Sequence, residues 1–330
     1  MSLIKFFFDD IRGVNVIIVG DVMLDSYIIG KIERKSPEAP VPIVNVSNKE
    51  NRIGGAANVA LNIKALGGIP HLCSCIGDDD AGNNFMSLMQ KNGLSSEGII
   101  SSNKRKTTVK ERIIVNKKHV LRIDDEMTST ISFNVQKKLI QIIKKLIDKS
   151  QLLIFQDYDK GILNKKFIHE IISFGKNKIT ITADPKNQNF EFYQNIDLFK
   201  PNLLEVCRGF NLNYKRVTIK QLELASKKHL KKKSINCLMI TMSKKGILVI
   251  NKNSTKHFKV FSRKIIDVSG AGDTVISIAS ICCYMSTSSS FLGHFSNLAG
   301  GLVCESSGVV PINKRKLSDE ASKNDLYKYL

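Results

Sequence analysis

The sequence contains no tryptophan, no Cys-x-x-Cys pair and no long apolar run. Its seven cysteines are scattered, which argues against a disulfide framework or a zinc site and favours a reducing, cytoplasmic environment. No apolar stretch reaches the roughly 18 residues that a membrane-spanning helix needs. Phe6-Phe7-Phe8 leads directly into two aspartates, so neither a signal peptide nor a membrane partner is expected. Internal repeats and low-complexity tracts are also missing.

Acidic residues are in the minority, with 30 Asp and Glu against 50 Lys and Arg, for a formal charge of +20. This excess favours acidic partners such as phosphorylated metabolites, nucleotides, nucleic acid or anionic surfaces, without choosing among them. Runs such as Lys231-Lys232-Lys233 are typical of solvated helix faces. A nucleic-acid-binding module would interleave aromatic side chains with its basic clusters, and these runs have none, so we expect no nucleic acid partner.

The apolar segment Val14–Val19 is typical of a central parallel strand buried on both faces. Further strand-like segments lie at 71–76, 152–155, 178–183, 197–200 and 237–241. Helix-like patterns lie at 54–66, 82–92, 132–148, 165–175, 218–232, 271–285 and 291–306. This alternation predicts an α/β fold with a doubly wound, mainly parallel sheet flanked by helices.

Residues 26–47 and 106–123 interrupt the alternation with short strand-like pieces. The first region carries the proline-bearing turn Ser36-Pro37-Glu38-Ala39-Pro40, and the second turns at Asn116-Lys117-Lys118. Proline in such strands implies sheet edges or bulges. We therefore predict a small antiparallel β flap, or lid, on one domain that covers residues 12–320.

The segment Gly270-Ala271-Gly272-Asp273 precedes an apolar helical run. Glycines allow a close backbone approach to a ligand, and the free amides of a helix N-terminus bind anions such as phosphate. A carboxylate at this position can accept a proton from an attacking hydroxyl. The alternative is a tight turn in which Asp273 caps the helix.

Two other motifs carry possible chemistry. Gly54-Gly55 followed by Asn58 permits close approach and hydrogen bonds to ligand hydroxyls, although the glycines alone are also compatible with a hinge. Asn202 and Glu205 share one face of a helix that begins after a strand, where they could hold hydrated Mg²⁺ and its phosphates. Their alternative is an ordinary capping box.

In this order along the chain, the three motifs resemble the ribokinase (PfkB) family of sugar kinases, from about Val14 to Ile312. Further segments look like the D-glycero-β-D-manno-heptose 7-phosphate kinase branch of that family. They are Gly20–Asp25, Ser36–Pro42, Gly54–Ala60, Leu121–Asp124, Asp157–Gly161 and Asp184–Lys186. Ser-Pro-Glu-Ala-Pro-Val-Pro at 36–42 is the most specific of them.

The resemblance implies transfer of a phosphoryl group from ATP to the anomeric hydroxyl of that heptose 7-phosphate, on the route to lipopolysaccharide core heptose. Asp273 would be the base, and the amides of Gly270, Ala271 and Gly272 would form the anion hole. The residues expected to bind ATP and Mg²⁺, the latter through water at Asn202 and Glu205, are Asn202, Leu203, Leu204 and Glu205. The residues expected to bind the sugar beneath the flap are Asp25, Gly54, Gly55 and Asn58.

The distal phosphate of such a substrate needs cations. The candidates, each in or beside a matched segment, are Lys160, Lys186, Arg112 and Arg122. The chain also departs from the family pattern. Ser269 replaces a threonine, and Gln156 and Asp159 replace the usual serine and alanine, so that Asp159 adds negative charge beside Lys160.

Members of the family commonly dimerise through their flap sheets, so a homodimer through the lid strands is expected. Many relatives carry a C-terminal adenylyltransferase half with an H-x-G-H motif; this sequence has no such motif, and no adenylyltransferase domain is expected. A ribokinase-like kinase for another sugar, sugar phosphate or nucleoside stays open as an alternative. A catalytically inactive subunit is disfavoured by the presence of Asp273, Asn202 and Glu205.

Overall fold

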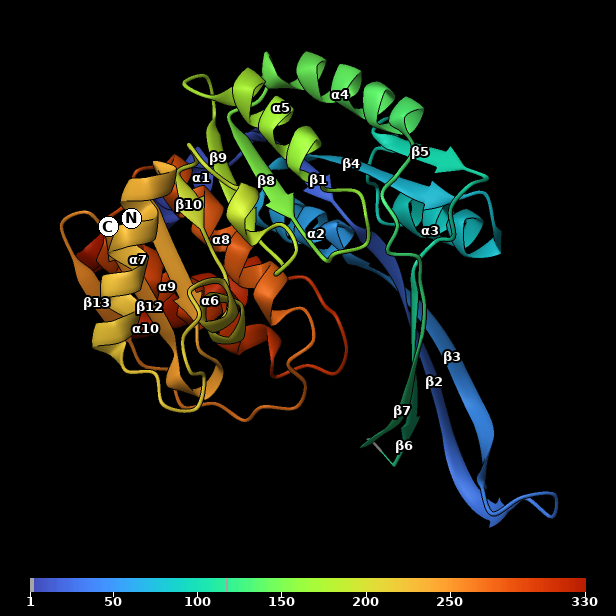
Figure 1. Ribbon diagram of the computed structural model, residues 1–330. Helices are drawn as coiled ribbons and strands as arrows, with labels where there is room; N and C mark the ends of the chain where they lie inside the picture. The colour runs from blue at the N-terminus through green and yellow to red at the C-terminus, as the bar shows by residue number, and fades with distance from the viewer. Residues whose placement is uncertain (1–2, 117) are drawn as a thin grey trace.

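A computed structural model describes residues 3–116 and 118–330, and it shows an α/β body from which a β flap extends (Figure 1). The main sheet has the strand order β13-β12-β11-β10-β9-β8-β1-β4-β5. Its strands are β1 (Asn15–Gly20), β4 (Ile69–Gly77), β5 (Ile99–Ser102), β8 (Leu152–Gln156), β9 (Thr180–Asp184), β10 (Leu198–Phe199), β11 (Cys237–Thr241), β12 (Ile247–Asn251) and β13 (Thr255–Phe258). All pairings from β11 to β5 are parallel, which confirms the predicted doubly wound sheet.

Helices cover both faces of this sheet. The helices are α1 (Leu3–Asp10), α2 (Ala56–Leu66), α3 (Asp80–Lys91), α4 (Phe133–Ile147), α5 (Lys165–Gly175), α6 (Leu203–Gly209), α7 (Ile219–Lys233), α8 (Ala271–Tyr284), α9 (Ser289–Val303) and α10 (Lys314–Lys323). In β1, Val16 and Ile18 join the core beneath α2, α8 and α9, whereas Ile17 and Val19 join the core beneath α4 and α5. This strand is therefore apolar throughout because successive side chains point into two different cores.

Several elements lie outside the predicted pattern. Strands β12 and β13 add an antiparallel edge to the sheet, and β5 extends its opposite edge. The predicted last helix is followed by α10, whose only buried residues are Leu317 and Ala321. An apolar stripe of two residues on a lysine-rich segment is too narrow to predict a packed helix.

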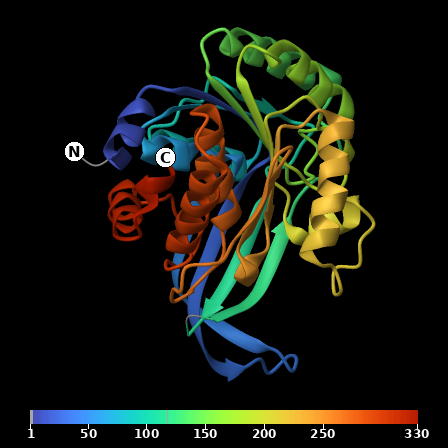
Figure 2. The same ribbon diagram turned by 90° about the vertical axis from the view of Figure 1, so that its left-hand side faces the viewer.

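The flap is a second sheet with the order β3-β2-β6-β7, and it projects from the body in both views (Figure 2). Its strands are β2 (Val22–Lys35), β3 (Pro42–Gly55), β6 (Val109–Val115) and β7 (Lys118–Asp125). The two hairpins are antiparallel, as predicted, and a parallel pairing of β2 with β6 joins them. Lys117, expected in the second turn, lies outside the described residues.

The flap strands are longer than predicted. The first hairpin extends from Val22 to Gly55, so Gly54 and Gly55 end β3, and the predicted helix start at Gly54 is wrong. Gly55 has a φ of +62°, and helix α2 begins at the next residue, Ala56. The glycine pair thus forms the sharp strand-to-helix junction at the root of the flap, next to the end of β1.

Candidate active site

The carboxyl ends of the central strands bring polar side chains to one edge of the main sheet. Asp21 follows β1, Gln156 ends β8, Asp184 ends β9 and Lys200 follows β10, and all four are buried. Strands β1 and β8 are neighbours, and the chain continues outward from them in opposite directions. Open α/β sheets bind ligands at such a reversal of strand order, outside the carboxyl ends of the strands.

The N-terminus of α8 lies at this edge. Gly270 occupies the N-cap position with a φ of +79°, a conformation that favours glycine. Among the described residues, the amides of Gly270 and Gly272 have no protein acceptor, whereas the Ala271 amide donates to the Val268 carbonyl at 3.3 Å. At least two of the three amides predicted for the anion hole are therefore available to a phosphate.

The two glycines also leave room for neighbouring groups. A Cβ atom at Gly270 would lie 2.9 Å from Nδ2 of Asn58. A Cβ atom at Gly272 would lie 4.0 Å from both the Asp184 carboxylate and the Lys200 ammonium. The helix N-terminus thus faces the predicted sugar residue Asn58 on one side and a buried charge pair on the other.

Asp273 is the third residue of α8, so it is not the helix cap, and its carboxylate is buried. Asn58 Nδ2 donates to its Oδ2 at 2.8 Å, while the Tyr158 hydroxyl and Gln156 Nε2 donate to its Oδ1 at 2.6 and 3.1 Å. Burial raises the pKa of Asp273 to about 6, and the hydrogen bonds from Asn58 and Tyr158 oppose that rise. The carboxylate is therefore ionised at neutral pH and able to accept a proton.

Asp25 and Gly54 meet at the root of the flap. A Cβ atom at Gly54 would lie only 2.0 Å from Oδ2 of Asp25, so the carboxylate occupies the space that the glycine leaves. Arg112 of β6 forms a buried ion pair with Oδ1 of Asp25. Burial raises the pKa of Asp25, and the Arg112 charge opposes this rise. Asp25 thus has a fixed orientation next to the glycine pair.

Asn202 and Glu205 form the capping box that was the alternative to a ligand site. The Glu205 amide donates to Asn202 Oδ1 at 2.9 Å, and the Asn202 amide donates to Glu205 Oε2 at 2.7 Å. The other oxygen of Glu205 accepts from Lys186 Nζ at 2.7 Å. Lys186, predicted among the cations for the sugar phosphate, therefore lies with the residues predicted for ATP. Leu203 packs partly into the core, and Leu204 is exposed.

Lys200 and Asp184 form a buried ion pair with an Nζ–Oδ2 distance of 2.9 Å. Gln156 Nε2 donates to the same Asp184 oxygen at 3.3 Å as well as to Asp273, so one amide bridges the two carboxylates. Neither Lys200 nor Asp184 was assigned a role from the sequence. Asp184 ends the apolar strand β9, and Lys200 directly follows the apolar strand β10. A charged residue at the end of an apolar strand is the signal that could have identified them.

The other three predicted cations gather where the flap meets the body. Arg112 and Arg122 are cross-strand partners in β6 and β7. Lys160 Nζ donates to Glu126 Oε1 at 2.6 Å, and Arg122 Nε lies 2.9 Å from Asp124 Oδ1. Lys110 lies within 4 Å of both acids and connects the two pairs. These contacts form a charged cluster of alternating sign at the flap root; its members are Lys110, Arg122, Asp124, Glu126 and Lys160.

The described residues fit Mg²⁺ only as an ion held largely by water and phosphate. No group of three or more His, Cys, Asp or Glu side chains within residues 3–116 and 118–330 could hold a metal ion. Both oxygens of Glu205 already accept from protein donors. Because Mg²⁺ retains several waters and is commonly bound through one or two carboxylates plus substrate phosphates, this donor set is compatible with it.

An apolar cavity of about 410 Å³ adjoins the Asn202–Glu205 segment through Leu203. Val217, Ile219, Met242 and Val260 supply its apolar wall, and the polar residues that also line it are Lys244, Lys245, His257 and Lys259. This cavity was missed from the sequence because its lining comes from four separate segments. Its volume and its apolar lining suit a flat, aromatic ligand group.

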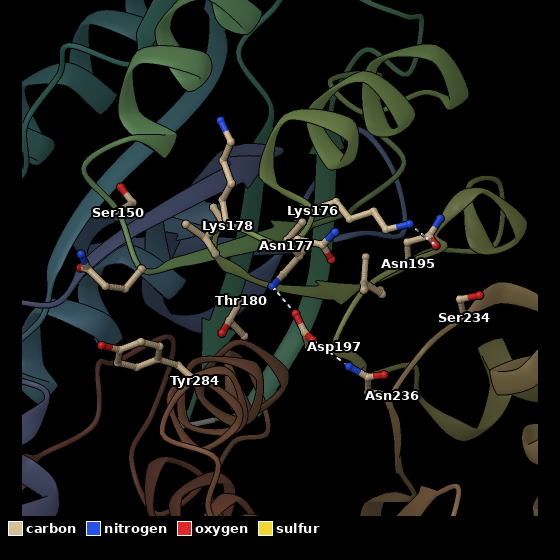
Figure 3. Close-up of a pocket in the computed structure, with 14 residues that line it drawn as sticks. Ser150, Lys176, Asn177, Lys178, Thr180, Asn195, Asp197, Ser234, Asn236 and Tyr284 are labelled. Carbon is tan, nitrogen blue, oxygen red and sulfur yellow. Dashed lines mark hydrogen bonds between the residues drawn. The ribbon is translucent and has the colours of Figure 1, made fainter.

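A larger cavity of about 810 Å³ lies at the other end of the strands, at the amino ends of β8, β9 and β11 (Figure 3). None of the predicted site residues lines it. Its charged groups have protein partners: Lys176 donates to Asn195, and Asp197 accepts from the Ile181 amide and from Asn236. These interactions stabilise the strand starts, so the candidate active site is the one at the carboxyl ends of the strands.

Comparison with known proteins identifies the family of this chain. The profile of the pfkB family carbohydrate kinases matches residues 15–315. The chain is 35% identical to the bifunctional protein HldE of Aliarcobacter butzleri over 291 residues, and 32% identical to that of Helicobacter pylori strain J99. These matches cover 88% and 87% of this chain but only 60% and 62% of the relatives, so the chain spans about three fifths of their length. The chain belongs to the pfkB family of carbohydrate kinases.

Solved structures give the same fold. A ribokinase from Arabidopsis thaliana, complexed with ribose and ATP, has a TM-score of 0.73 at 16% identity over 97% of this chain and 100% of that one. Phosphofructokinase-2 from Escherichia coli, in complex with fructose-6-phosphate, has a TM-score of 0.75 at 17% identity over 94% and 99%. The ribokinase-like fold predicted from the sequence is thereby confirmed. No helix in the described part of the chain has both the length and the apolar character to cross a bilayer.

Proposed function

We propose that this kinase phosphorylates the anomeric hydroxyl of D-glycero-β-D-manno-heptose 7-phosphate with ATP, and so forms the 1,7-bisphosphate for lipopolysaccharide core heptose. The observation that supports this most strongly is the hydrogen bond between Asn58 and Asp273, which joins the predicted sugar site to the predicted base. The heptose branch is supported by the matched segments at 36–42 and 157–161 and by the relatives named bifunctional protein HldE.

In the proposed reaction, Asp273 takes the proton of the anomeric hydroxyl while the oxygen of that hydroxyl bonds to the γ-phosphorus of ATP. The bond between that phosphorus and the β-phosphate oxygen breaks, and ADP leaves. The free amides at Gly270 and Gly272 and the positive end of α8 stabilise the charge on the transferring group. Asp25 and Asn58 orient the sugar, so the site acts by positioning and electrostatics, as phosphoryl transfer requires.

The nucleotide would extend from α8 toward α6. Its phosphates would lie beside Asn202, Glu205 and Lys186, and its base would fill the apolar cavity next to Leu203. Lys200, buried beside the helix N-terminus, adds a second cation on the phosphate side. Mg²⁺ held by water at Asn202 and Glu205 would neutralise phosphate charge when bound.

A substrate panel tests the proposed specificity. We expect turnover of the heptose 7-phosphate to exceed that of ribose, fructose 6-phosphate and adenosine, with the product identified by phosphorus NMR as the 1,7-bisphosphate. Equal turnover of any of these competitors would reject the heptose assignment and leave a pfkB kinase for another acceptor. The same panel run without acceptor gives the background rate of ATP hydrolysis.

The 7-phosphate would bind to the charged cluster at the flap root. Arg122→Ala is expected to raise KM for the sugar phosphate about tenfold, because a charge-assisted phosphate contact is lost, and to leave KM for ATP nearly unchanged. Lys186→Ala, in contact with Glu205, is expected to act chiefly on KM for ATP. Initial-rate measurements, with the sugar phosphate and ATP varied in turn, distinguish the effect of Arg122→Ala from that of Lys186→Ala. Equal effects of Arg122→Ala on both KM values would reject its assignment.

The flap also supports the proposed homodimer. Strand β7 is one of its two outer strands, every residue of β7 is exposed, and Leu121 and Ile123 share one face of it. An edge strand with exposed apolar side chains is a template for pairing with a second chain. Sedimentation equilibrium is expected to give a dimer for the wild type and a monomer for Leu121→Asp with Ile123→Asp. A wild-type monomer at micromolar concentration would contradict this proposal.

A further inference from the structure

The hydrogen bonds to Asp273 differ in one chemical respect. Asn58 and Gln156 offer amide donors, whereas Tyr158 offers a hydroxyl, and its 2.6 Å bond to Oδ1 is the shortest of the three. A general base needs the hydroxyl of its substrate within roughly 2.6–3.2 Å. The tyrosine hydroxyl therefore occupies the kind of position on the carboxylate that an acceptor hydroxyl must take.

The backbone and the side chain of Tyr158, which lies in the loop after β8, are held by separate contacts. Asp21 accepts from the amides of Tyr158, Lys160 and Ile162 at 2.8, 3.2 and 3.1 Å, and these bonds hold the loop against the end of β1. Departure of the phenol from Asp273 therefore requires rotation about its side-chain bonds but no change in the loop backbone.

The aromatic ring connects the base to the nucleotide side. Lys186 Nζ lies 5.3 Å from the ring centroid, and the same ammonium donates to Glu205. Burial, followed by the charge of Asp273, raises the pKa of the Tyr158 phenol well above its usual value. Tyr158 therefore remains a protonated donor at physiological pH and is not itself a nucleophile.

We propose that Tyr158 is a positioning residue that occupies Asp273 until the sugar arrives, and that it thereby suppresses ATP hydrolysis by water. The acceptor hydroxyl of the sugar displaces the phenol from Oδ1. In the suppressed side reaction, a water oxygen bonds to the γ-phosphorus, its proton passes to Asp273, and the bond to the β-phosphate oxygen breaks to release ADP and phosphate. This inference rests on the proposed roles of Asp273 and ATP, but not on the identity of the sugar.

The test is ADP release in the absence of any sugar, measured for the wild type, Tyr158→Phe and Tyr158→Leu. Loss of a hydrogen bond to a charged group is worth roughly 1.5–3 kcal/mol. In the Tyr158 variants we therefore expect the ratio of the hydrolysis rate without sugar to the rate of sugar phosphorylation to be about tenfold or more above that of the wild type. Tyr193→Phe is the matched control, because Tyr193 is a buried tyrosine that donates to Asp157 at 3.0 Å and does not contact Asp273. We expect no change in its hydrolysis rate.

Two further readouts separate this role from a structural one. The Asp273→Asn change added to Tyr158→Phe is expected to return hydrolysis to the background rate. The acidic limb of the kcat/KM profile is expected to move to higher pH in Tyr158→Phe, because the Tyr158 bond lowers the pKa of Asp273. Unchanged hydrolysis in both Tyr158 variants, or an equal rise in Tyr193→Phe, overturns the inference. Equal turnover of another acceptor in the substrate panel would instead reject the heptose assignment, and it would not affect this test, which uses no sugar.

Discussion

Replacement of Asp273 by asparagine is expected to lower kcat for sugar phosphorylation by about a thousandfold, since general-base catalysis typically contributes 10²–10⁴. Asparagine keeps the shape of the side chain and an oxygen acceptor for Tyr158 or Asn58, but it cannot take the proton. We expect the KM values to change little, because the proposed contacts to the sugar come from Asp25 and the flap cations. Initial rates with both substrates at saturation measure the effect.

The effect of Asp273→Asn on folding stability must be separated from its effect on the catalytic rate. Burial raises the pKa of Asp273 above its usual value, so the ionised carboxylate opposes folding increasingly as pH rises through about 6. Its neutral replacement is therefore not expected to lower the melting temperature at pH 8 by more than a few degrees. Asp197→Asn, at the opposite edge of the sheet, is the matched control and should retain wild-type kcat. A normal rate in Asp273→Asn would remove the base from the mechanism.

Substitution of Gly54 by alanine is expected to impair sugar binding severely. The added Cβ atom would lie 2.0 Å from the Asp25 carboxylate. The carboxylate must therefore move, which disrupts its ion pair with Arg112. Such overpacking commonly costs about 1–3 kcal/mol, so we expect KM for the sugar to rise tenfold or more while KM for ATP stays near the wild-type value. Steady-state kinetics with each substrate varied checks this.

Gly301→Ala is the control for that change. Gly301 lies within α9, and its new Cβ atom would lie 3.2 Å from Cδ of Arg263, a contact that a shift of a few tenths of an ångström in that side chain would relieve. Alanine in a helix interior is favoured over glycine by about 0.5–1 kcal/mol, so kinetics should be unchanged and stability equal or higher. An equal loss of sugar affinity in both variants would show that Gly54 has no specific role beside Asp25.

The sequence was sufficient to predict the central parallel strands and the flap, and to single out Asn58 and Asp273, which lie 215 residues apart and form a hydrogen bond in the structure. Apolar strands and the order of the glycine motifs carry that information. The length of the first flap hairpin was underestimated because polar residues such as Asn48 and Lys49 pair there without burial. Strand pairing far from a core leaves little hydrophobic pattern to detect.

The parts of the site that were not predicted depend on side-chain direction. Tyr158 and Gln156 lay in or beside a matched segment, yet nothing in the sequence indicates that both side chains turn toward Asp273. Lys186 was grouped with the sugar phosphate because of its charge and its motif, and only the fold brings it to Glu205. Rotamers and loop geometry, which decide these contacts, are set by tertiary packing.

The central claim is that the acceptor oxygen and the transferring phosphate meet between Asp273 and the start of α8. A crystal structure with the heptose 7-phosphate and a non-hydrolysable ATP analogue tests it most directly. We expect the anomeric oxygen within about 3.2 Å of the Asp273 carboxylate, and the γ-phosphate on the Gly270 and Gly272 amides. A sugar bound with its anomeric oxygen away from Asp273, or a γ-phosphate away from those amides, would contradict the account.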